Sequence, residues 1–83
     1  MKAIIKNYET KEYLGEIEVR KNLKMSTIAD KVCEYLQEKH QCTIRKRLIQ
    51  GQLDFATKTQ EIHYVLFGDN LPCRTIDIEL EEN

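Results

Sequence analysis

Hydrophobic and polar positions repeat with two different periods along this chain. Residues 3–9 and 13–20 are short β-favouring runs, and in the second of them apolar and charged positions alternate. A period of two is typical of a strand with one buried face, so the pair predicts a β-hairpin. In residues 25–36 apolar positions instead recur at spacings of three and four, which predicts one amphipathic helix. From Cys42 onward the period returns to two.

Strand-like runs fill the second half of the chain. They occupy residues 43–49, 52–57, 61–67 and 73–80. Gly51 separates the first two, either as a tight hairpin turn or as a bulge within one longer strand, and both interpretations stay open. The order predicts an α+β fold: ββα followed by three or four strands, with the helix packed on a mainly antiparallel sheet. The 83 residues are expected to form one domain, 1–83.

The start of the predicted helix reads S-T-I, at residues 26–28. Ser26 or Thr27 is expected to cap the helix, with Asp30 as a capping-box candidate. A hairpin, a helix that opens with S-T-I, and then RLIQGQL and EIHYVLFG resemble the order of elements in ubiquitin-like β-grasp proteins. The resemblance implies a β-grasp-like architecture, and we infer no conjugation chemistry from it.

Composition and charge narrow the class of protein. Hydrophobic residues make up 41% and charged residues 33%, which is a globular mixture. The net charge of −1 divides into +4 over residues 1–50 and −5 over residues 51–83. Such asymmetry fits a basic face for an acidic partner, or charge pairing between neighbouring strands. No apolar run approaches the roughly 20 residues needed to span a bilayer. With no signal-peptide pattern either, we expect a cytoplasmic protein without membrane contact.

Catalytic and cofactor motifs are poorly represented. Ser26 is the only serine and is expected at the helix start, which leaves little for a serine nucleophile. The glycines, Gly15, Gly51 and Gly68, lie too far apart for a Gly-rich phosphate loop. Most carboxylates fall on apparently solvated faces, where their pKa values would not be raised for acid catalysis. We therefore expect neither an enzyme nor a cofactor, and no small-molecule substrate.

The cysteines and histidines raise the question of a metal site. Cys33, Cys42 and Cys73 are odd in number and contain no C-x-x-C, which predicts free thiols in a reducing compartment. A site built from His40, Cys42, His63 and Cys73 would need distant loops to converge. The short-spaced ligand pairs of structural zinc sites are absent, so we expect no metal.

Three successive cations, Arg45, Lys46 and Arg47, precede Gly51. On a regular strand the two arginines would share a face about 6.6 Å apart and could contact successive phosphates. Three more cations lie just before the predicted helix, at Arg20, Lys21 and Lys24. A solvated edge strand and a protein-facing salt-bridge patch are the alternatives. This cluster carries our second functional hypothesis, a nucleic-acid-binding accessory protein.

The run at residues 61–67 is apolar on both of its faces. One helix covers only one face of a sheet, so Val65 and Phe67 are expected at or beside a partner surface. Tyr35 lies beside the helix stripe, as a wall of the core or as a partly exposed anchor. Our first functional hypothesis is therefore a small non-enzymatic protein-interaction module of the adaptor or inhibitor kind. A homodimer is its simplest assembly.

Overall fold

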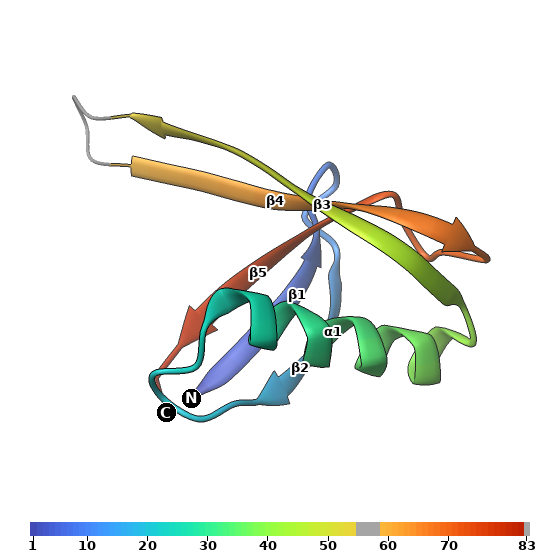
Figure 1. The fold of residues 1–83 in the computed structure, drawn as a ribbon, viewed down its shortest axis with the longest axis horizontal. Coiled ribbons are helices and arrows are strands. Elements are labelled where there is room, and N and C mark those ends of the chain that lie inside the picture. The colour runs from blue at the N-terminus through green and yellow to red at the C-terminus, as the bar shows by residue number, and fades with distance from the viewer. Residues whose placement is uncertain (55–58, 83) are drawn as a thin grey trace.

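The computed structural model describes residues 1–54 and 59–82, with side chains described for residues 1–51 and 63–82. One helix packs on a five-stranded antiparallel sheet (Figure 1). The elements in chain order are β1 (Lys2–Asn7), β2 (Tyr13–Glu18), α1 (Met25–His40), β3 (Thr43–Asp54), β4 (Thr59–Asp69) and β5 (Thr75–Glu81). The α+β prediction is confirmed, with three strands after the helix.

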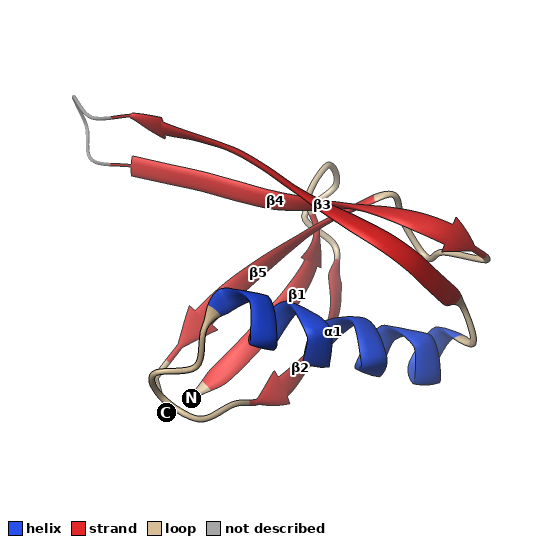
Figure 2. Cartoon of the chain, viewed as in Figure 1, coloured by secondary structure: helices blue, strands red, loops and turns tan. Residues whose placement is uncertain are grey.

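The strands lie side by side in the order β2-β1-β5-β4-β3 (Figure 2). Every neighbouring pair is antiparallel, including β1 with β5. The sheet therefore has β2 and β3 at its edges and β5 at its centre. The doubly apolar run at residues 61–67 belongs to β4, which lies one place in from the edge and not at the centre.

Gly51 is neither a turn nor a bulge. It lies opposite Ile62 in β4, in continuous register with the pairs on either side, so the first predicted run continues into residues 52–54 as one strand. Residues 55–57 of the second predicted run lie outside the described residues. The register shifts instead between Ile44 and Lys46, next to the position where Gly68 lies opposite Ile44. A Cβ atom on Gly68 would come 1.8 Å from the Thr43 carbonyl oxygen, so only glycine permits this close approach.

The core lies between α1 and one face of the sheet, which we call the inner face; the opposite face is the outer face. The largest fully buried side chains are Tyr64, Ile5, Ile28, Leu36, Leu66, Ile76 and Val32. Those of α1 recur at spacings of four, because successive positions on one helix face are three or four residues apart. The predicted amphipathic stripe is confirmed.

The helix begins earlier than its S-T-I sequence suggested. Lys24 is the N-cap residue, without a side-chain capping bond, and its carbonyl oxygen accepts hydrogen bonds from the amides of Thr27 (3.0 Å) and Ile28 (3.1 Å). Ser26 and Thr27 lie inside the first turn, so the predicted cap was wrong. Asp30 pairs with a strand residue instead.

The molecule is elongated, with extents of 40 × 25 × 21 Å, because the β3–β4 ribbon runs out beyond the other strands (Figure 1). Along residues 1–54 and 59–82, no helix combines the length and apolar character needed to cross a membrane.

Candidate interaction surface

An exposed apolar surface lies on the outer face of the β3–β4 ribbon. Tyr64 and Leu66 point into the core, each only 2% exposed, so their neighbours Val65 and Phe67 point outward. Phe67 is 46% exposed and Val65 is half-buried. Leu48 of β3 lies opposite Val65 and is 40% exposed. We call Leu48, Val65 and Phe67 the outer apolar patch.

One aromatic stack covers part of the outer face beside this patch. The ring of Tyr8, from the turn between β1 and β2, lies 4.0 Å from the ring of His63, nearly parallel to it at 17°. Lys11 places its ammonium 4.6 Å from the centre of the Tyr8 ring. Within the described side chains, His63 Nδ1 has no hydrogen-bond partner, while the Tyr8 amide donates a hydrogen bond to the Thr75 carbonyl oxygen at 3.1 Å. The cover reaches His63 but leaves Phe67 and Leu48 exposed.

The rest of the outer face, over β2, β1 and β5, is charged and internally paired. Lys2 pairs with Glu16 of β2 at 3.3 Å, and Lys6 pairs with Glu79 of β5 at 3.1 Å. The Tyr13 hydroxyl donates a hydrogen bond to Glu16, and together with Lys2 it lowers the pKa of that carboxyl. Charge pairing between neighbouring strands is therefore present here, and the large hydrophobic side chain exposed among these charges is Tyr13, at 55%.

Tyr35 lies away from the outer apolar patch. It is half-buried against the core on the inner face, where it covers β2 at Gly15. A Cβ atom on Gly15 would come 2.3 Å from the Tyr35 hydroxyl oxygen, and the φ of +143° also favours glycine there. Tyr35 is thus a wall of the core, and the predicted set of Val65, Phe67 and Tyr35 does not form one surface.

The predicted cation cluster is divided by the register shift in β3. Arg45 forms an ion pair with Asp69 at the end of β4. Arg47 instead reaches α1, where it pairs with Asp30 at 2.5 Å and donates to the Ser26 carbonyl oxygen at 3.1 Å. The two arginines therefore do not present one shared face to a ligand.

The other predicted cations lie at the far end of the helix from Arg45. Residues 20–24 precede the N-terminus of α1, whereas β3 begins beside its C-terminus (Figure 1). Lys21 forms a long ion pair with Glu82, at 3.9 Å, while Arg20 and Lys24 are exposed. The structure does not join these three residues to Arg45.

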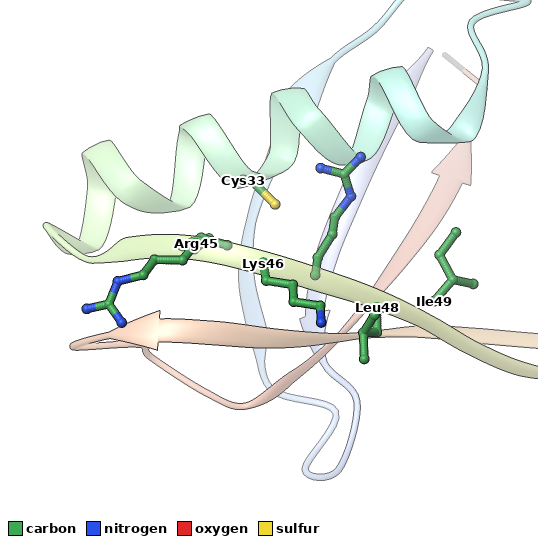
Figure 3. A pocket seen from close by; sticks show the side chains of 7 residues that line it. Cys33, Arg45, Lys46, Leu48 and Ile49 are labelled. Atoms are coloured by element: carbon green, nitrogen blue, oxygen red, sulfur yellow. The ribbon is translucent and has the colours of Figure 1, made fainter.

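An open groove separates α1 from β3. It has a volume of about 500 Å³ and is lined by Cys33 and by residues 44–49 (Figure 3). Burial raises the pKa of the Cys33 thiol, although Arg47 beside it acts in the opposite direction. A thiol that keeps its proton at neutral pH is a poor nucleophile.

The four side chains considered as metal ligands are dispersed over the fold. Cys42 is buried and its thiol contacts the Leu36 carbonyl oxygen at 3.5 Å, whereas the Cys73 thiol contacts the Thr75 carbonyl oxygen at 3.4 Å. Among the described residues, no three His, Cys, Asp or Glu side chains form a group that could hold a metal ion.

Comparison with known proteins found no matching family model, curated protein or solved structure. Sequence reasoning found Val65 and Phe67 but missed Leu48, because the strand pairing that brings it opposite Val65 is not visible in the sequence.

Proposed function

We propose that this protein is a non-enzymatic protein-interaction module that binds its partner through the outer apolar patch. The observation that carries the proposal is the exposure of Phe67 (46%) and Leu48 (40%) on one face of two adjacent strands. Grouped apolar side chains on a monomer surface tend to mark an interaction site. An aromatic ring next to aliphatic side chains is also a common core of protein interfaces.

A second copy of the chain is the simplest partner. A two-fold interface brings the same patch of both copies together, so each Phe67 can pack against apolar side chains of the other copy. Two sheet faces pack about 10 Å apart, a spacing that side chains of this size fill. The charged outer face over β1 and β2 already satisfies its own ion pairs and would lie beside the contact.

Nucleic-acid binding is the alternative, and the geometry supports it less. A phosphate would have to displace Asp69 from Arg45 or Asp30 from Arg47. Phosphate binding should weaken steeply as salt rises, whereas an apolar interface should respond little. Loss of binding in the Arg45→Ala/Arg47→Ala double variant, at low salt, would favour this alternative over the apolar patch.

Sedimentation of the wild type, Phe67→Asp and Leu80→Asp tests the proposal. Leu80 is a matched control, since it is 44% exposed and lies opposite Ala3 on the inner face. We expect a wild-type dimer, a folded Phe67→Asp monomer, and a dimer for Leu80→Asp. A wild type that stays monomeric at high concentration would overturn the homodimer. A Phe67→Asp chain that unfolds would show that Phe67 supports the fold instead.

A further inference from the structure

We infer that the free edge of β3 is a second binding site, which accepts an extended acidic segment of another protein as an added strand. This site goes beyond the proposed function, because it uses the edge of the sheet and the groove beside α1, not the outer face around Phe67. Strand addition of this kind obtains affinity from main-chain hydrogen bonds and specificity from alternate side chains.

The groove has the shape that an added strand requires. β3 is an edge strand, and its second edge pairs with no other strand in the described part of the chain. The groove follows six consecutive residues of β3, 44–49, which is about 20 Å of extended chain. Cys33 of α1 forms the opposite wall, and its thiol points toward β3 (Figure 3). A peptide could therefore lie along β3 with one face turned toward the helix.

The backbone at one end of the groove already faces α1. The amide of Ile44 donates a hydrogen bond to Gln37 Oε1 at 3.0 Å, across the gap between strand and helix. A side chain here supplies the acceptor that a neighbouring strand would otherwise supply. Since backbone groups of a strand alternate between its two edges, further groups toward Ile49 also point to this edge. Gln37 marks where the strand-binding part of the groove ends.

The edge is protected at one end and open at the other. Register irregularities and charged side chains are features that keep edge strands from pairing. Both occur near Arg45, where the register shifts and an ion pair to Asp69 forms. Residues 48–51 contain no charge, and their register with β4 is continuous. Ile49 is 61% exposed there, so this end of β3 is available for pairing.

The side chains along the edge define the chemistry of the segment. Along β3, Lys46 and then Leu48 lie on the outer side (Figure 3). Arg47 and then Ile49 lie on the side of α1. Each face of the strand therefore presents a cation and then an apolar residue. Lys46 has no ion pair among the described side chains. Arg47 pairs with a surface carboxylate, Asp30, and donates to the Ser26 carbonyl oxygen; a ligand carboxylate can replace the Asp30 carboxylate. An antiparallel segment with two apolar residues followed by two acidic residues matches both faces.

NMR titration with the acetylated hexapeptide TVIDET tests the site. We expect shifts of the amide signals of residues 44–49 and of Cys33. The charge-reversed peptide TVIKKT should bind about tenfold more weakly, since it loses its ion pairs. In the Lys46→Glu variant this preference should largely disappear, since position 46 then repels the acidic residue opposite it while Arg47 still attracts the other. The inference would be wrong if TVIDET at millimolar concentration left these signals unchanged, or if the two peptides bound equally.

Methylated peptides separate strand pairing from simple charge attraction. N-methylation of every second peptide amide blocks hydrogen bonds on one peptide edge. One of the two alternating sets should therefore weaken binding about tenfold, and the other should have little effect. Equal binding of both sets would overturn strand addition.

Two variants separate this site from the outer apolar patch. Ile49→Asp should lose the peptide and keep the dimer, whereas Phe67→Asp should lose the dimer and keep the peptide. Each variant thus tests one proposal independently, so that one proposal can fail while the other holds. Joint loss of peptide and dimer in a folded Ile49→Asp variant would show a single shared surface and would contradict a separate edge site.

Discussion

The two faces of β4 carry similar side chains in very different surroundings. On the inner face Tyr64 and Leu66 are each 2% exposed, beneath α1. On the outer face Val65 is half-buried and Phe67 is 46% exposed. The comparison shows that apolar residues on both faces of a strand do not imply burial on both faces. In this chain the helix covers one face of β4 and leaves Phe67 on the other face nearly half exposed.

Helix length explains the difference. The 16 residues of α1 span about 24 Å at about 1.5 Å per residue, enough to cover one face of the central strands. Outer cover comes from the turn between β1 and β2, where Tyr8 stacks on His63. The β3–β4 ribbon runs out beyond the other strands (Figure 1), and its outer side chains Leu48 and Phe67 are 40% and 46% exposed.

The largest expected effect is a difference in the free energy of unfolding between substitutions at two neighbouring residues of β4 that point to opposite faces. Leu66→Ala removes a fully buried side chain and should lower the free energy of unfolding by about 2–5 kcal/mol. Phe67→Ala should cost less than about 1 kcal/mol, because the ring is nearly half exposed before the change. Urea unfolding below the concentration of self-association measures both. Equal losses would show that the outer face is packed as tightly as the inner face.

Most of the fold could be predicted from the periodicity of the sequence, because the buried positions of a helix or a strand recur with the period of that element. The stripe in residues 25–36 placed α1, and the strand-like runs indicated each described strand, although β3 was divided between two runs. Gly51 was misleading, since glycine is frequent in turns and bulges, whereas here continuous pairing with β4 holds it within a strand. The true irregularity, between Ile44 and Lys46, arises from the close approach at Gly68 on another strand. A contact between distant segments leaves no local signal.

The candidate surface was only partly predictable for the same reason. Val65 and Phe67 followed from the alternation within one strand. Tyr35 did not, because its position over Gly15 depends on how α1 crosses β2. The arginines were expected on one face, yet Arg47 bonds to α1 and Arg45 to β4, through carboxylates far away in the sequence.

A smaller effect distinguishes the two arginines of β3. The Arg47 side chain is 26% exposed, whereas that of Arg45 is 65% exposed. A double-mutant cycle with Arg47→Met and Asp30→Asn should give a coupling of up to about 1 kcal/mol. The matched cycle with Arg45→Met and Asp69→Asn should give less, because water screens the more exposed pair. A larger coupling at Arg45 would mean that exposure does not control the strength of these pairs.

The smallest expected effect is a loss of stability at alkaline pH, which comes from buried groups on the inner side of the sheet and is absent at neutral pH. Burial raises the pKa of the Cys33 thiol above 9.0 and that of the Tyr64 hydroxyl above 10.0. The folded protein therefore keeps these protons to higher pH than the unfolded chain does. Their contribution to stability is complete below about pH 9 and is lost as the pH rises through the folded pKa values.

Urea unfolding between pH 7 and pH 11 should accordingly show a decline in stability that begins near the ordinary thiol pKa. Cys33→Ala should reduce the early part of this decline, and Tyr64→Phe the part above about pH 10, because each variant removes one titrating group. The quantity to compare is the slope of the free energy of unfolding against pH. A packing change caused by the substitution alters this free energy equally at every pH, whereas loss of a titrating group alters the slope. A decline of unchanged slope in both variants would place the titrating groups elsewhere and would contradict the burial of these side chains beneath α1.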